Sequence, residues 1–176
     1  MNQLFISITF LFTVFCSCGQ HNAGNPGNVN LTKPVGTDTP KKTFRLDTNI
    51  IAILPADKVR SYIFHGNKPM ELTNNDLAAI EHLLTDRIKK HNARQDTTKE
   101  FSEFIDLKKY KRQYVPYIDS NGERKVYINC FCIDDFGFNY WKTQLVEVDD
   151  GGSCFFQVVI NLTRQKDEWF TINGYG

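Results

Sequence analysis

The sequence has no excess of charge of either sign, since 21 Lys and Arg residues face 20 Asp and Glu residues. A nucleic-acid-binding domain needs a basic field to attract phosphates, so a net charge of +1 argues against nucleic acid as a partner. The sequence also lacks a Gly-rich phosphate loop, a nucleophile elbow, an H-E-x-x-H motif and an internal repeat. No standard motif therefore indicates catalysis, and we expect neither a metal ion nor another cofactor.

A hydrophobic run long enough to cross a membrane is also missing. The apolar run at residues 4–15 (LFISITFLFTVF) holds about twelve residues, whereas a membrane-spanning helix needs about twenty. A run of this length fits the apolar core of a secretory signal peptide.

Cys16, Ser17 and Cys18 follow this run. A small residue directly before a cysteine resembles the lipobox at which signal peptidase cuts bacterial lipoproteins. The resemblance implies that residues 1–17 are a signal peptide and that Cys18 becomes the lipidated first residue. A lipid anchor would then hold the protein on a membrane of the bacterial cell envelope. Because no acidic cluster follows Cys18, we expect the protein to face the periplasm.

The next segment, residues 18–41, is rich in Gly, Asn and Pro and has almost no large apolar side chains. This composition predicts a flexible linker. Residues 42–176 then have the length of one ordinary domain, and the chain as a whole is 41% hydrophobic. We expect a single folded domain in this range.

The first part of that domain predicts two short strands and one long helix. Residues 49–54 and 61–64 are rich in β-branched or aromatic side chains and are bounded by turn formers, which favours strands. Thr73 is a candidate helix cap, with Asp76 three residues later. Apolar residues recur at helical spacing from Leu77 onward, so we expect a helix that ends near Asn92.

The second part predicts an antiparallel meander. Strands at residues 114–118 and 124–132 flank Asn121 and Gly122, and a two-residue turn there places Tyr117 opposite Val126 and Val115 opposite Ile128. A further hairpin, with a bulged turn, is expected between residues 144–148 and 153–162. A last strand at residues 169–173 would point Phe170 and Ile172 inward.

These elements predict an α+β fold in which one main helix packs on a curled antiparallel meander sheet, as in a cystatin-like or NTF2-like roll. The segments YKRQYVPY, INCFC, DGGSCFFQVVINL and NGYG, between Tyr110 and the C-terminus, also resemble a family of bacterial lipoproteins. That resemblance brings no known activity and no site residues.

Three cysteines lie in the predicted sheet, and alternation points all three inward. A disulfide of Cys154 with Cys130 or Cys132 is one interpretation, and it would leave one free thiol. The other interpretation is that all three are small core residues. The spacing does not supply the four ligands of a closed zinc site.

One connecting segment combines carboxylates with aromatic rings and is a candidate contact surface for a peptide, glycan or partner protein. Its residues are Asp134, Asp135, Phe136, Phe138, Tyr140 and Trp141. Alternatively, the rings close one end of the sheet while the aspartates shape turns.

The favoured functional hypothesis is therefore an envelope lipoprotein whose domain binds a partner without catalysis. A second hypothesis is an envelope hydrolase that gathers Asp134 or Asp135 and His65 in a cavity of the curled sheet. A third is a structural component of an assembly, which would show a large exposed apolar patch.

Overall fold

The structure, a computed structural model of the chain, describes residues 44–59, 62–98, 103–133 and 137–176. One main helix packs on an open six-stranded mixed sheet, so the predicted α+β class is confirmed. The helix is α1 (Asn74–Asn92). The strands are β1 (Ile51–Ile53), β2 (Lys68–Pro69), β3 (Tyr110–Ile118), β4 (Arg124–Cys132), β5 (Phe155–Asn161) and β6 (Lys166–Ile172). Three single turns of 3-10 helix are η1 (Tyr62–Phe64), η2 (Leu107–Lys109) and η3 (Gly152–Cys154).

Helix α1 begins where the sequence predicts. Thr73 Oγ1 accepts a hydrogen bond from the Asp76 backbone N–H (3.2 Å), and Asp76 Oδ2 accepts one from the Thr73 N–H (2.9 Å). This capping box satisfies two of the N–H groups that a helix start leaves without partners. Asp76 also receives two hydrogen bonds from Arg124 on β4, at 3.0 and 2.7 Å. The cap therefore also fastens the helix start to the sheet.

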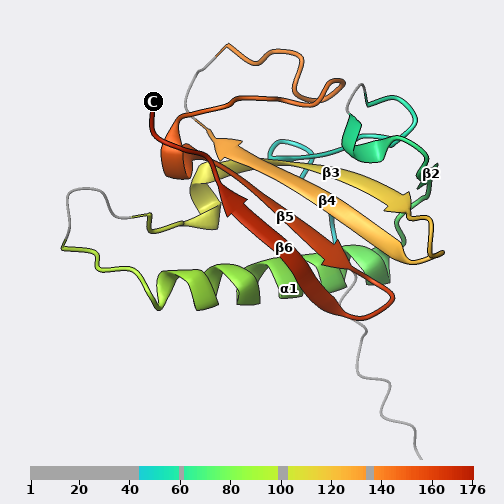
Figure 1. The fold of residues 1–176 in the computed structure, drawn as a ribbon, viewed down its shortest axis with the longest axis horizontal. Coiled ribbons are helices and arrows are strands. Elements are labelled where there is room, and N and C mark those ends of the chain that lie inside the picture. The colour runs from blue at the N-terminus through green and yellow to red at the C-terminus, as the bar shows by residue number, and fades with distance from the viewer. Residues whose placement is uncertain (1–43, 60–61, 99–102, 134–136) are drawn as a thin grey trace, which may run out of the picture. The chain divides into compact units, whose positions relative to one another are not determined.

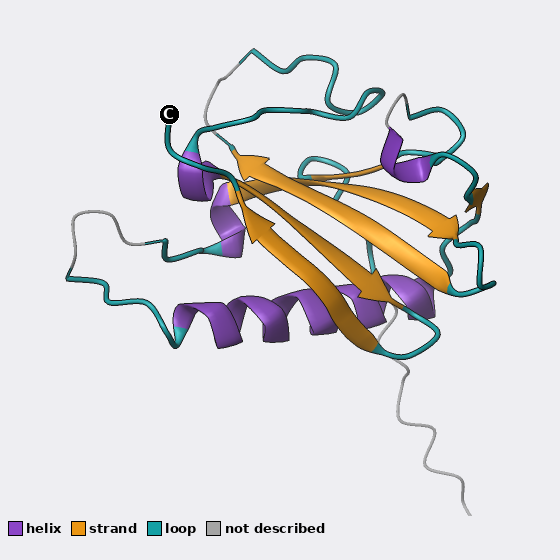
Figure 2. Cartoon of the chain, viewed as in Figure 1, coloured by secondary structure: helices purple, strands orange, loops and turns teal. Residues whose placement is uncertain are grey.

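Strands β3 to β6 form the predicted antiparallel meander, and β1 adds a parallel strand beside β3. Helix α1 lies along one face of the sheet, while η1 and the connection after β4 lie on the other (Figures 1 and 2). We call these the inner face and the outer face. Within the described residues no helix is both long and apolar enough to span a membrane.

Both faces of the sheet are buried. The inner face forms the main core with the apolar side of α1, and its fully buried members include Ile80, Leu84, Tyr114, Val126, Ile128, Phe156, Val158 and Ile160. The outer face carries two smaller clusters, which contain Val115, Tyr117, Tyr127, Phe131 and Phe155. The strands at the centre therefore have apolar residues at successive positions rather than a clean alternation.

A nearly buried ion pair joins α1 to the inner face. Arg112 on β3 donates a hydrogen bond to Glu81 Oε2 on α1 at 2.8 Å, and the Tyr114 hydroxyl donates one to Glu81 Oε1. Burial, together with the adjacent Glu81 carboxylate, raises the pKa of Tyr114 well above its usual value. The hydroxyl therefore stays protonated and keeps its role as a donor.

The predicted register of the first hairpin is wrong by one residue. Tyr114 lies opposite Ile128 and Tyr117 opposite Lys125, because a five-residue loop replaces the two-residue turn. Asp119 sets that loop: its Oδ1 accepts hydrogen bonds from the backbone N–H groups of Asn121 and Glu123 at 2.9 and 3.0 Å. This side-chain turn competes with the tighter turn that Asn-Gly favours.

The predicted hairpin between residues 144–148 and 153–162 is also wrong. Strand β5 pairs directly with β4, and residues 144–148 form no strand. The segment instead crosses the outer face, where Val146 is 3% exposed. Its apolar alternation reflects burial against the sheet rather than membership of it.

The predicted strand at residues 61–64 is wrong where the structure describes it, since Tyr62–Phe64 is the 3-10 turn η1. Phe64 packs edge to face on Tyr117 and Tyr127, with ring centroids 5.7 and 5.4 Å apart. The final strand is confirmed as β6, and Phe170 and Ile172 pack against the inner core as predicted.

Candidate functional site

An apolar groove of about 600 Å³ lies at the edge of the sheet. Its walls come from the end of β1, from the end of β2 with the segment that follows it, and from the second half of β3. The lining residues are Ile53, Pro55, Pro69, Met70, Glu71, Leu72 and Pro116. Concave apolar surfaces of this size are the usual form of a binding site for a small molecule or for side chains of a partner.

The groove exists because the sheet edge is interrupted. Strands β1 and β2 both pair with β3, but β1 ends opposite Tyr114 and β2 reaches along β3 only as far as Tyr117. Pro116 lies in this gap and has no N–H to continue the ladder. No strand can pair fully there, so a space remains between β1 and β2.

The groove lies on the inner side of the sheet. Ile53 shares a face with Ile51, a member of the core under α1, because side chains two apart on a strand point the same way. Met70 and Leu72 pack against the same core while remaining partly exposed. The groove is thus a place where the main core reaches the surface, and Ile53 is 39% exposed.

The backbone of β1 faces outward beside the groove. Ile50 O accepts a hydrogen bond from β3 at 2.7 Å, and the Leu54 N–H donates one to β3 at 2.8 Å. Because successive strand residues direct their backbone groups to opposite sides, Ile51 and Ile53 direct theirs away from β3. Strand β1 is the terminal strand on this side in the described part of the sheet.

The aromatic segment after β4 is not an exposed contact surface where the structure describes it. Trp141 is 7% exposed and packs edge to face against Phe131, with ring centroids 6.1 Å apart. Phe138 packs in the same way on Phe131 at 5.8 Å. Only Tyr140, 41% exposed, faces solvent among the predicted rings that the structure describes. Asp134, Asp135 and Phe136 lie outside the described residues.

A row of side-chain amides holds this segment on the outer face. Gln113, Asn129 and Gln157 lie side by side on β3, β4 and β5. Gln113 Nε2 donates to Trp141 O and to Gln144 O (2.7 Å), and its Oε1 accepts from the Val146 N–H (2.9 Å). The amides therefore supply the backbone partners that a neighbouring strand would otherwise provide.

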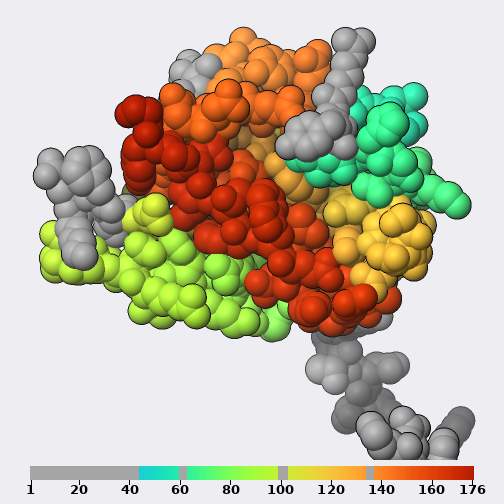
Figure 3. Space-filling view, viewed as in Figure 1, coloured from blue at the N-terminus to red at the C-terminus, as the bar shows by residue number. Residues whose placement is uncertain are grey.

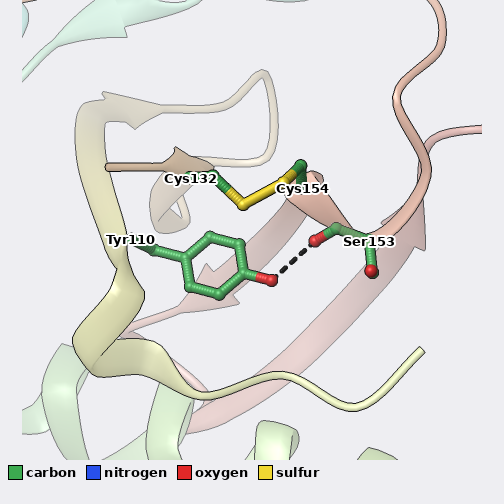
Figure 4. Close-up of a disulfide and its surroundings, with 4 residues drawn as sticks. All are labelled: Tyr110, Cys132, Ser153 and Cys154. Atoms are coloured by element: carbon green, nitrogen blue, oxygen red, sulfur yellow. Dashed lines mark hydrogen bonds between the residues drawn. A yellow bond between two sulfur atoms is a disulfide. The ribbon is translucent and has the colours of Figure 1, made fainter. Parts of the chain in front are cut away.

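A disulfide joins the two ends of the same connection. Cys132 at the end of β4 bonds to Cys154 in η3, with their Cα atoms 5.0 Å apart. Beside it, the Tyr110 hydroxyl donates a hydrogen bond to Ser153 O at 2.7 Å (Figure 4). Of the two pairings that the sequence left open, the structure has Cys132 with Cys154.

Cys130 is the free thiol that this pairing leaves, and it is fully buried under α1. Burial raises the pKa of its thiol well above the usual value, an effect that nearby Arg112 only partly offsets. A buried thiol that stays protonated is a poor nucleophile. The surroundings of Cys130 therefore indicate that it is a core residue rather than a reactive thiol.

A second, smaller hollow of about 380 Å³ lies over the outer face. Val59 and Leu145, which pack against the cluster around Tyr127, form its floor, and the exposed side chains of Lys58, Gln144 and Glu147 line its rim. In the space-filling view the connection after β4, in orange, lies along the top of the molecule (Figure 3). The three rim side chains are exposed to solvent.

The residues of the hydrolase hypothesis are not brought together within the described ranges. His65 is exposed in the loop after η1, and its two proposed carboxylate partners lie outside those ranges, as does Cys18. No group of three or more His, Cys, Asp or Glu residues that could hold a metal ion occurs in residues 44–59, 62–98, 103–133 and 137–176.

Sequence reasoning missed the groove. A usable signal was present, since Pro55, Pro69 and Pro116 each lack the N–H that pairing along one edge of a strand would need. Nothing local in the sequence shows that the three points meet in space. Comparisons with family models, with curated proteins and with solved structures found no match for this chain.

Proposed function

We propose that this protein is a non-catalytic binding module that takes up an extended apolar segment of a peptide or partner protein in the groove between β1 and β2. The observation that carries the proposal is the groove itself. It combines an apolar lining with an outward-facing strand edge, formed by Ile53 and its neighbours. Apolar area gives affinity, while the strand edge orients an extended chain.

The proposed setting is the bacterial cell envelope, with the module held on a membrane by a lipid on Cys18. The apolar run at residues 4–15 and the Ser17-Cys18 pair support this setting. Partners would then be envelope peptides or proteins. Replacing Cys18 by Ser should remove radiolabelled palmitate and release the protein from the membrane fraction, whereas Cys16→Ser should keep both. Equal labelling of the two variants would overturn the anchor.

The groove is tested with a blocked hexapeptide of alternating valine and threonine, titrated into the purified protein by calorimetry. Ile53→Thr should weaken binding about fivefold to tenfold, because it removes apolar contact area while keeping a strand-forming residue. Ile63→Thr is the matched control, since Ile63 is 37% exposed but lies in η1, away from the groove lining. Equal affinities of the two variants, or no binding by the unaltered protein, would contradict the proposed function.

A further inference from the structure

We infer that the partner segment is added to the sheet as a β-strand along β1, that it centres on Ile53, and that it presents a basic residue to Glu71. This inference rests on the proposed function, because it states how the same groove is occupied. The occupant is thus a segment with an extended backbone, apolar side chains on one face and one Lys or Arg.

The backbone of β1 offers a short and well-defined pairing site. Ile53 directs both its N–H and its C=O away from β3, and Ile51 directs its C=O the same way. The Ile51 N–H is already used, since it donates to Asp47 O at 2.9 Å. Pro55, the next residue with outward geometry, has no N–H to offer. One backbone donor and two acceptors are therefore available on this edge, between the Ile51 N–H, which is already bonded, and Pro55, which has no N–H.

So short a pairing site cannot give much affinity alone, because each exposed backbone hydrogen bond has a small net value. The groove supplies the rest. Side chains of an added strand alternate between the two faces of the sheet, and those on the inner side would point toward Met70 and Leu72. Edge pairing thus fixes the register, and the groove selects apolar residues at every second position.

Glu71 gives the groove a charge preference. It is exposed, and it is the residue of the lining that carries a charge. A cation on the partner would meet this carboxylate at the margin of an apolar surface, where attraction adds selectivity without the cost of burying both charges. An acidic residue at the same position would be repelled.

The backbone claim is tested with N-methylated versions of the valine-threonine hexapeptide. In an added strand, alternate N–H groups face β1 and the others face solvent. Methylation at positions of one parity should weaken binding about tenfold or more, while methylation at the other parity should have little effect. Hydrogen exchange of the Ile53 amide, followed by NMR, should slow when the unmethylated peptide binds.

The charge preference is tested with three versions of the same hexapeptide. One threonine is replaced by lysine in the first, the same threonine is replaced by glutamate in the second, and the third is unmodified. In low salt the lysine peptide should bind more tightly than the unmodified and glutamate peptides. Glu71→Gln should reduce the ratio of the lysine peptide's affinity to that of the unmodified peptide by about twofold to fivefold. Added salt should have the same effect as the substitution.

The two proposals fail in different ways. If peptides bind but both methylation parities are tolerated and Ile53 exchange is unchanged, strand addition is wrong while the groove remains a binding site. If no peptide binds, the proposed function itself is wrong. If sedimentation shows a dimer in which the Ile53 amide is protected without peptide, the occupant is a second copy of this chain, and the partner-segment inference is overturned.

Discussion

Gln113 and Asn129 lie opposite each other on β3 and β4, and Asn129 Nδ2 donates a hydrogen bond to Gln113 Oε1 at 3.0 Å. Asn129 Nδ2 also donates to Val146 O at 2.6 Å. Gln113 has no exposed surface and Asn129 is 2% exposed. Two buried amides thus take the place of a strand in binding the connection between β4 and β5.

Replacing Gln113 by Ala should therefore destabilise the protein by about 2 to 4 kcal/mol, because it leaves buried backbone groups of the connection without hydrogen-bond partners. The free energy of unfolding, measured in urea, is the readout. Gln157→Ala is the control: Gln157 belongs to the same amide row but is only partly buried, and its loss should cost less than about 1 kcal/mol. Similar losses for the two variants would show that the row does not anchor the connection.

The capping carboxylate should make stability depend on pH in the acid range. Burial acts to raise the pKa of Asp76, but the hydrogen bonds from Arg124 and Thr73 prevail and hold it below the usual 3.8. A group with a lowered folded pKa contributes fully above its unfolded pKa and loses that contribution as the pH falls through the folded value. Stability from Asp76 should thus be present at neutral pH and decline below about pH 4.

Asp76→Asn should lower the free energy of unfolding at pH 7 by about 2 kcal/mol and flatten its dependence on pH below about 4. Urea unfolding at a series of pH values measures both effects. Asp86→Asn is a suitable control, since the contacts of Asp86 with His82 and Lys89 on α1 are exposed. An unchanged acid slope in the Asp76 variant would assign the pH dependence to other groups.

Reduction of the Cys132–Cys154 disulfide should lower the free energy of unfolding by about 3 kcal/mol. The two cysteines are 22 residues apart, and closing a loop of this order restricts the unfolded chain by about that amount. Urea unfolding with and without a thiol reductant gives the value. The double variant Cys132→Ser with Cys154→Ser should match the reduced protein, and reductant should then have no further effect.

Cys130 should react with a thiol reagent only when the domain opens. Its side chain is inaccessible, and burial raises the pKa of the thiol, so the reactive thiolate is scarce in the folded state. Labelling monitored by mass spectrometry should be slow in buffer and complete in concentrated urea. Rapid labelling of the native protein would show that α1 separates readily from the sheet.

Trp141→Ala should destabilise the domain by about 3 to 5 kcal/mol, because it opens a cavity between Phe131 and the connection. Tyr140→Ala, next to it but exposed, should cost less than about 1 kcal/mol. Thermal unfolding of both variants makes the comparison. The opposite order would return Trp141 to the role of a surface contact residue.

The parts of the fold that local signals determine were predictable. Helix α1 follows from the 3.6-residue apolar period between Leu77 and Ile88, with Thr73 and Asp76 marking its start. The last strand follows from its alternation, which places Trp169 outside and Phe170 inside. In both cases one face packs against the core and the other is more exposed, so the sequence pattern carries the orientation.

The register of β3 against β4 was not predictable in the same way. Both faces of these strands are buried, so Tyr114 and Val115 are each fully covered although they point to opposite sides. A shift by one residue then exchanges one apolar set for another, and the pattern cannot reject it. The decision falls to Asp119, whose hydrogen bonds set the loop length.

The groove was beyond sequence reasoning for a different reason. It depends on the parallel pairing of Ile51–Ile53 with β3, a contact between segments about sixty residues apart. The prolines show where a pairing N–H is missing, but only the folded sheet brings Pro55, Pro69 and Pro116 to one place.

The pairing of β4 with β5 also determines which sulfur atoms can meet. Cys130 lies opposite Phe156, so Cys132 and Cys154 face each other where the same register continues. A slip of two residues would bring Cys154 opposite Cys130 and would leave every side chain on its proper face. A disulfide formed between Cys130 and Cys154 in the slipped sheet would hold the wrong register covalently. Correct folding therefore requires that β4 and β5 pair in their native register before the disulfide forms. Chains that are oxidised earlier must exchange their disulfide to reach the native pairing.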